Sequence, residues 1–176
     1  MLTSKERAEL RAQANSIETT LMVGKDGVTE NVIAEAENLL NARELLLSGN
    51  YTCVICQGET VFTSTRRGVA PLLNWLENGT DLAGFSAADR VVGRGAAFLY
   101  CLLKVKAVHA RVMSLPAADV LKLYGIEAYA DTFVNGIINR AGTGPCPFEA
   151  AVMGIQSAEE ALAAILNTRR QLLKGN

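Results

Sequence analysis

The residues best suited to chemistry lie in two short stretches of the chain, 86–94 and 139–149. The first contains Ser86, Asp89, Arg90 and Arg94 at the start of a largely apolar run that we expect to form a helix. Polar side chains at the N-terminal end of such a helix suit a ligand site, because its backbone donors and dipole favour anions. The alternative is that Ser86 and Asp89 only cap the helix.

The second stretch is a turn-rich loop that leads into a short helix. Cys146 stands at the expected helix start, where a thiol can be activated as a nucleophile, with Asp89 or Glu149 as its partner. The alternative is a buried structural thiol. The candidate catalytic residues are therefore Asp89, Cys146 and Glu149. The candidate ligand-binding residues are Ser86, Asp89, Arg90, Arg94, Asn139, Arg140 and Cys146.

Two of the four cysteines, Cys53 and Cys56, have the spacing of a redox or zinc pair. They lie in the run Tyr-Thr-Cys-Val-Ile-Cys, which reads as a strand, and residues three apart on a strand point to opposite faces. We therefore expect buried thiols rather than a metal clip or a disulfide.

The bulk composition excludes several classes of protein. The chain has 176 residues, is 49% hydrophobic and carries a net charge of −1, which suits one packed domain and argues against a polyanionic partner. No apolar run approaches the ~18 residues of a membrane span, and the N-terminus does not read as a signal peptide. We expect a cytoplasmic protein with no membrane partner.

The hydrophobic pattern predicts the elements that must position these residues. Thr29 caps a helix over 29–47, followed by a hairpin of strands 51–56 and 60–64 and a helix over 69–76. A buried helix is expected over 86–103, because apolar residues cover most of its circumference. Further elements are a strand over 106–114, a helix over 116–124, a strand over 126–130 and a last helix that Ser157 caps.

The first 47 residues resemble the first half of the YhbY-like, or CRM, RNA-binding domain. The matching runs are Leu-Thr-Ser-Lys-Glu-Arg-Ala, Val-Gly-Lys-Asp-Gly and Val-Thr-Glu-Asn-Val-Ile, in a helix, strand, loop and helix order. The resemblance implies that Gly24, Lys25 and Gly27 approach the phosphates of an RNA, such as a ribosomal one. The second half of that domain does not follow, and this arm has net charge −3, so the alternative is a purely structural arm.

Residues 38–154 resemble an uncharacterised bacterial family, a domain of unknown function with a cytidine-deaminase-like fold. The matching runs include Tyr-Thr-Cys-Val, Ala-Asp-Arg-Val-Val-Gly and Asn-Arg-Ala-Gly-Thr-Gly-Pro-Cys-Pro-Phe-Glu. The resemblance implies an α/β fold, a three-layer α-β-α sandwich with a mixed sheet and a buried central helix, plus a small N-terminal helix-strand-helix arm. We divide the chain into an arm, 1–47, and a deaminase-like domain, 48–176, which share the helix over 29–48.

The zinc motifs of the deaminases do not carry over to this sequence. By position, the first ligand falls on Ala87 and the catalytic glutamate on Asp89, while both cysteine ligands fall on Ala117 and Val120. Methyl and isopropyl groups cannot hold zinc, so we expect no metal and no cofactor. A rival alignment would build a zinc site from Cys146, Glu149 and the single histidine, His109.

Three functions follow as hypotheses. The leading one is a deaminase-fold protein without the zinc chemistry that binds a nucleotide or RNA. The second is an enzyme that uses Cys146 with Asp89 or Glu149 in the former zinc pocket. The third is an interaction module that forms homo-oligomers.

Overall fold

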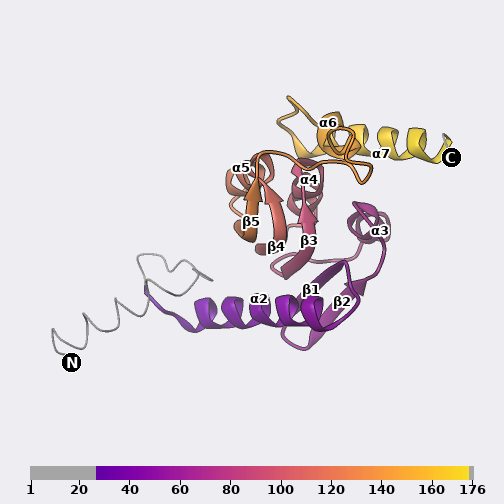
Figure 1. Cartoon of the computed structure of the whole chain (residues 1–176). Helices are drawn as coiled ribbons and strands as arrows, with labels where there is room; N and C mark the ends of the chain where they lie inside the picture. The colour runs from indigo at the N-terminus through magenta and orange to yellow at the C-terminus, as the bar shows by residue number, and fades with distance from the viewer. Residues whose placement is uncertain (1–26, 175–176) are drawn as a thin grey trace.

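The computed structural model describes residues 27–174 and contains one mixed sheet of five strands (Figure 1). The strand order is β2-β1-β3-β4-β5. The first helix and the strand expected in the N-terminal arm, with the loop residues Gly24 and Lys25, lie outside the described residues. Gly27, the first described residue, is exposed and has a φ of +73°.

The sheet joins an antiparallel hairpin to three parallel strands. The hairpin strands β1 (Cys53–Gln57) and β2 (Thr60–Ser64) turn at Gly58, and β1 also pairs antiparallel with β3 (Ser86–Val92). Strands β3, β4 (Ala107–Ser114) and β5 (Glu127–Val134) are parallel. Helices α4 (Arg94–Leu102) and α5 (Leu115–Leu123) connect them, as parallel neighbours require.

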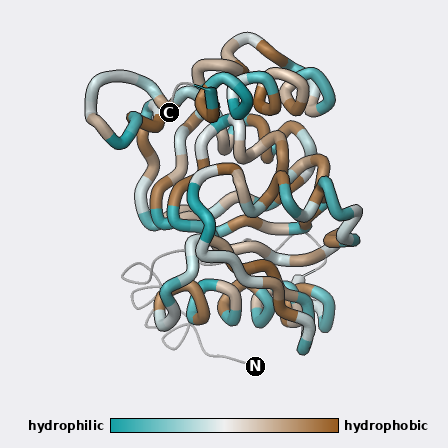
Figure 2. Tube along the Cα trace, turned by 90° about the vertical axis from the view of Figure 1, so that its right-hand side faces the viewer, coloured by the Kyte–Doolittle hydropathy of each residue, from teal (hydrophilic) through white to brown (hydrophobic). Residues whose placement is uncertain are grey.

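Among the helices of residues 27–174, α2 (Glu30–Ser48) alone covers one face of the sheet (Figure 2). The Thr29 hydroxyl caps it by accepting a hydrogen bond from the Val32 backbone N–H at 3.3 Å. Its Ala42 and Leu46 pack on Val54 and Ala88, which project from β1 and β3 on this side. The small residues at 42 and 88 allow the helix to lie close to the sheet.

The other face of the sheet carries the remaining helices. These are α4, α5, α3 (Ala70–Glu77), α6 (Pro147–Ala151) and α7 (Ala158–Lys174). Every residue of α4 from Gly95 to Cys101 is buried, so α4 is the central helix of this layer. The predicted three-layer α/β fold with a mixed sheet and a buried central helix is confirmed. None of the described helices is long and apolar enough to cross a membrane.

The prediction of a single helix over 86–103 is wrong for its first half. Residues 86–92 form strand β3, and only Arg94–Leu102 is helical. Because helices cover both faces of β3, Ala87 and Ala88 are both completely buried. A strand buried on both faces lacks the alternation of an exposed strand, so its pattern resembles that of a buried helix.

Two glycines let α6 and the loop before it approach the start of α4. A Cβ on Gly95 would lie 2.9 Å from the backbone oxygen of Phe148, and one on Gly93 would lie 3.0 Å from Ile137 and 3.1 Å from Glu149. Only residues without side chains fit at such distances. The loop and α6 are therefore held against the β3–α4 junction, where they form one wall of the candidate site.

We predict that Gly95→Ala destabilises the protein, although alanine is the better helix former by ~1 kcal/mol. The added methyl group meets backbone rather than a flexible side chain, and such overpacking costs about 1–3 kcal/mol. Urea denaturation of the variant measures the net loss. Gly136→Ala is the matched control, because a Cβ there has no neighbour within 4 Å. A gain in stability by the ~1 kcal/mol that helix propensity alone predicts would contradict the close contact.

Candidate functional site

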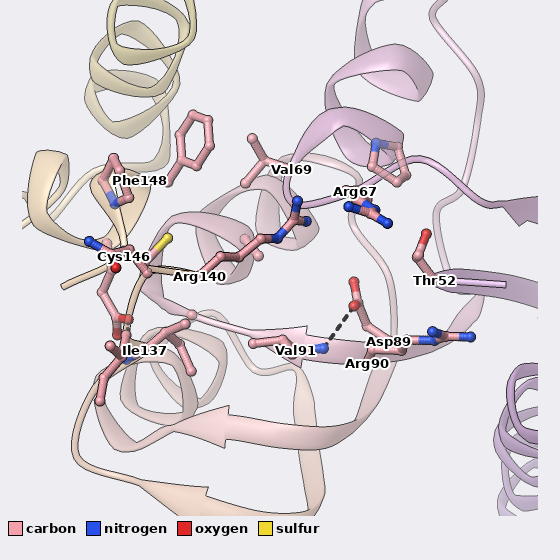
Figure 3. A pocket seen from close by; sticks show the side chains of 18 of the residues that line it. Thr52, Arg67, Val69, Asp89, Arg90, Val91, Ile137, Arg140, Cys146 and Phe148 are labelled. Atoms are coloured by element: carbon pink, nitrogen blue, oxygen red, sulfur yellow. Dashed lines mark hydrogen bonds between the residues drawn. The ribbon is translucent and has the colours of Figure 1, made fainter. Parts of the chain in front are cut away.

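A cavity of about 750 Å³ opens where β3 ends and α3, α4 and α6 begin. This volume is typical of small-molecule sites, and the carboxyl ends of parallel strands are a frequent place for them. Its lining comes from the start of β1, the loop before α3, strand β3, the β3–α4 junction, the loop 137–149 and the last turn of α7. Figure 3 shows most of these side chains around the space.

Asp89 is the buried acid of this cavity. It lies on β3 opposite Cys53 of β1 and is 9% exposed. One carboxylate oxygen accepts a hydrogen bond from the Tyr100 hydroxyl at 2.8 Å, and the other accepts one from the Val91 backbone N–H at 3.1 Å. The latter bond is the dashed line of Figure 3. Tyr100 lies on α4, so this hydrogen bond ties the central helix to β3.

A third group, the Cys53 thiol, completes the network behind Asp89. Its sulfur lies 3.2 Å from the Tyr100 oxygen. Burial, followed by the charge of Asp89, raises the pKa of the thiol and of the phenol well above their ordinary values, so both stay protonated. Since Tyr100 donates its proton to Asp89, Cys53 donates to Tyr100. The chain of donors holds the carboxylate in one orientation.

Burial also determines the charge of Asp89. It raises the pKa of the carboxyl from 3.8 to about 6, against the opposing effect of the hydrogen bonds from Tyr100, Val91 and Arg90. Between pH 3.8 and about 6 the folded chain keeps this proton, whereas the unfolded chain has lost it. The free energy of unfolding therefore falls as the pH rises through this range. Above that window the ionised carboxylate costs the folded state about 3 kcal/mol. An uncompensated cost of this kind is typical of functional sites.

Three arginines, Arg67, Arg90 and Arg140, line the same cavity. All three are exposed, and none forms an ion pair with a residue in the 27–174 range. In Figure 3 the Arg140 side chain extends from the loop before α6 toward the start of α3, where Arg67 lies. Free guanidinium groups around a cavity are suited to a phosphate or carboxylate of a ligand.

Five of the predicted ligand-binding residues line this cavity, and two do not. Asp89, Arg90, Asn139, Arg140 and Cys146 are brought together there, from stretches 50 residues apart, and Glu149 joins them. Whether they bind a ligand stays a prediction.

Ser86 and Arg94 do not line the cavity and have structural roles. Ser86 is buried at the far end of β3 and caps no helix, because the helix starts eight residues later. The Arg94 guanidinium turns away from the cavity, donates to the Ile155 carbonyl at 2.7 Å and lies 5.6 Å from the centre of the Phe98 ring. It ties α4 to the connection between α6 and α7. Capping by Asp89 is likewise wrong, since Asp89 is on a strand.

Thr52 and Arg67 line the cavity but were not among the predicted site residues. Both come from the loops around the hairpin, where no periodic pattern marks a site. The available signal was the run Arg-Arg-Gly before a proline near a helix start, which is typical of an anion-binding turn. Gly68 in this run has a φ of +60°, which favours glycine.

Glu149 is held by structural hydrogen bonds rather than left free as a base. One of its oxygens accepts from the Ile137 backbone N–H at 2.6 Å. The other accepts from the Ser114 hydroxyl and, at 3.5 Å, from the backbone N–H of Arg94 at the start of α4. The carboxylate thus joins the end of β4, the start of α4 and the loop before α6. This arrangement leaves Cys146 without Glu149 as a free basic partner.

The residues around the cavity do not fit the zinc site of the deaminases. Ala87 and Asp89 lie on a strand instead of at a helix start, and Ala117 is buried in α5. The rival alignment also lacks its third ligand, because His109 faces α2 across the sheet and lies 3.1 Å from Asp131. Within residues 27–174, no three metal-ligating side chains gather in one place. Cys53 and Cys56 point to opposite faces, as predicted.

We predict that Glu149→Gln destabilises the protein by about 1–3 kcal/mol, because an amide supplies one acceptor oxygen where three donors need two. Urea denaturation provides the measurement. Glu37→Gln, on the exposed side of α2 and away from its ends, makes the same chemical change without these contacts and should leave stability unchanged. If both variants unfold like the wild type, Glu149 does not hold the cavity wall.

The comparisons with known proteins agree with this fold. The family model described as a domain of unknown function, DUF1893, matches residues 41–168, and the CRS1/YhbY (CRM) domain matches residues 2–47. Both resemblances predicted from the sequence are therefore confirmed. No curated protein is significantly similar to the chain.

Two solved structures are similar to the chain. The DUF1893 family protein TM1506 from Thermotoga maritima is 23% identical, with a TM-score of 0.69 over 87% of this chain and 97% of that one. The apo dCMP deaminase from the cyanophage S-TIM5 is 11% identical, with a TM-score of 0.37 over 58% of this chain and 99% of that one. The first of these shows the same fold. Since the DUF1893 family model matches most of the length of this chain, the chain belongs to the DUF1893 family.

Proposed function

We propose that the cavity binds a nucleotide. The observation that carries this proposal is one cavity of about 750 Å³ that holds a buried, largely ionised carboxylate and three arginines, none of which pairs with an acid in the described part of the chain. The arginines suit a phosphate, whereas the carboxylate requires a ligand that also presents hydrogen-bond donors. A nucleoside phosphate has both kinds of group and an apolar ring system besides.

Thr52, Arg67, Asp89 and Arg90 lie together at one end of the cavity, and the Arg140 side chain extends toward this end from the loop before α6 (Figure 3). The Thr52 carbonyl accepts a hydrogen bond from the Arg90 backbone N–H at 3.1 Å, and the Thr52 hydroxyl donates to the Arg66 carbonyl. These bonds join the loop that carries Arg67 to the strand that carries Asp89. Helix α3 begins just after Arg67, but its Ala70 N–H donates to the Arg67 carbonyl and Pro71 has no N–H, so the guanidinium groups are the partners for an anion at this end.

The other end of the cavity is apolar. Its walls are the side chains of Ile137, Pro147 and Phe148, with Gly93 between them and β3. Gly93 is four residues beyond Asp89, a distance of ~13 Å along an extended chain. Such a cavity suits a nucleotide that lies along β3, with its base on the apolar side chains and its phosphate near Arg67.

The N-terminal match supports RNA as a source of the nucleotide. A CRM domain match covers residues 2–47, which include the loop residues Gly24, Lys25 and Gly27 that we predict to approach phosphates. RNA binding by this loop stays a prediction. So does the homo-oligomeric interaction module, which concerns surfaces other than the cavity.

The enzymatic alternative has less support. Cys146 lines the cavity and is only partly buried, but Glu149 is occupied by three donors. Asp89 belongs to the polar end, whereas the Cys146 backbone N–H donates to Ile137 at the apolar end. A nucleophile needs its base within hydrogen-bond reach. The residues therefore support binding better than nucleophilic catalysis.

We predict that Arg67→Gln weakens the binding of a nucleoside 5′-monophosphate by about 10–100-fold, since a charged hydrogen bond contributes about 1.5–3 kcal/mol. Isothermal titration calorimetry on the full chain, with the four ribonucleoside 5′-monophosphates as ligands, measures the loss. Arg111→Gln removes an exposed arginine of β4 outside the cavity and should bind like the wild type. No binding of any nucleotide to the wild type would refute the proposal, as would equal binding by the two variants.

A further inference from the structure

We infer that Asp89 recognises the 2′,3′-cis-diol of a ribonucleoside 5′-phosphate, either free or at the 3′ end of an RNA chain. This inference rests on the proposed function and specifies which part of the nucleotide the cavity recognises. It assigns to the cavity a preference for ribose over deoxyribose.

The hydrogen bonds of Asp89 leave acceptor capacity on both carboxylate oxygens. Tyr100 and the Val91 backbone donate to different oxygens, while the nearby Arg90 N–H donates to the Thr52 carbonyl at 3.1 Å and the Cys53 thiol lies against the Tyr100 hydroxyl. About two of the roughly four lone-pair sites of the ionised carboxylate are therefore left open. Asp89 also lines the cavity, and Figure 3 shows its carboxylate directed into the space. Both oxygens are thus held in fixed positions with room for one further donor each.

The group that binds there must donate hydrogen bonds. A phosphate is excluded as a direct partner of Asp89, because two anions in a site of low dielectric constant repel each other strongly. Hydroxyl and amino groups are the remaining choices in a nucleotide. Two neighbouring hydroxyls match two neighbouring carboxylate oxygens, and acidic side chains bind ribose hydroxyls in this way in dinucleotide-binding folds.

The position of Asp89 favours the sugar over the base. It shares the polar end of the cavity with Arg67, where the phosphate has its best partner. The base has its best partners at the opposite end, on Ile137, Pro147 and Phe148. Since the ribose links the base to the phosphate, its hydroxyl edge is the part that comes to lie over β3.

A free nucleotide and the 3′ end of an RNA share this chemistry. Both carry a phosphate on the 5′ oxygen and two free neighbouring hydroxyls. An internal nucleotide of an RNA has its 3′ oxygen esterified, and DNA has no 2′-hydroxyl. The N-terminal CRM match makes the RNA end a source that must be tested beside the free nucleotide.

The first test is calorimetry with the tightest-binding ribonucleoside 5′-monophosphate and its 2′-deoxy and 3′-deoxy analogues. Wild type should bind each deoxy analogue at least about 10-fold more weakly, the effect of one charged hydrogen bond. Asp89→Asn should bind all three within about threefold of one another, because the amide keeps the shape of the side chain but not its paired acceptors. Asp119→Asn, which removes an exposed acid of α5, should retain the preference of the wild type.

Two results of this test would overturn the inference. One is equal binding of ribose and deoxyribose forms by the wild type, which refutes the role of Asp89 while nucleotide binding itself stands. The other is a loss, in Asp89→Asn, of discrimination between bases but not between sugars. Absence of all nucleotide binding would remove the proposed function and this inference together.

The second test distinguishes the two sources with a five-residue RNA that ends in free hydroxyls or in a 3′-phosphate. If the source is RNA, the hydroxyl-ended oligomer binds more tightly than the mononucleotide and the 3′-phosphate abolishes this gain. If the source is a free nucleotide, the mononucleotide binds more tightly than either oligomer. Equal, tight binding of both oligomers would overturn recognition of the diol.

Discussion

The buried carboxylate of Asp89 is the constraint around which the cavity is built. A charge in this position is costly, and burial raises its pKa to about 6 in spite of the hydrogen bonds it receives. The Tyr100 hydroxyl and the Val91 backbone offset part of the cost and hold the oxygens in place. No ion pair with a residue in the 27–174 range offsets the remaining cost. Retaining a carboxylate is understandable if a ligand needs it.

The rest of the structure serves to keep this carboxylate beside an open cavity. Ala87 and Ala88 allow helices on both faces of β3, so the strand that carries Asp89 lies in the centre of three layers. Gly95 then lets α6 approach α4, and Glu149 fastens α6 and the loop before it to the end of β4 and the start of α4. The wall opposite Asp89 is therefore tied to the two elements on either side of it.

Many of the helices and turns could be predicted from the sequence, because the local sequence signals agree with the local structure. The Thr29 cap, the hairpin turn at Gly58, Pro116 near the start of α5 and the Ser157 cap all mark elements that the structure contains. Strand β3 was the exception, since burial on both faces removes the alternation that distinguishes a strand.

Site residues could be predicted where the chemistry of a side chain and its position in the sequence point to the same role. Asp89, Arg140 and Cys146 stood out as reactive or charged residues in apolar or turn-rich surroundings, and all three line the cavity. Arg94 and Glu149 were equally good candidates in the sequence, but hydrogen bonds to residues distant in the sequence give them structural roles. Arg67 reaches the cavity through a loop whose path depends on the whole fold.

The most direct measurement is the free energy of unfolding of wild type and Asp89→Asn, obtained by urea denaturation at pH 4 and at pH 8. Asparagine keeps the acceptor for Val91 but cannot ionise. Because the folded pKa of Asp89 lies above the unfolded one, the wild type loses stability relative to the variant as pH rises between 3.8 and about 6. We predict that the stability difference moves in favour of the variant by about 2–3 kcal/mol from pH 4 to pH 8. A difference that stays constant with pH would show that Asp89 is not a buried, costly carboxylate, and would contradict the account.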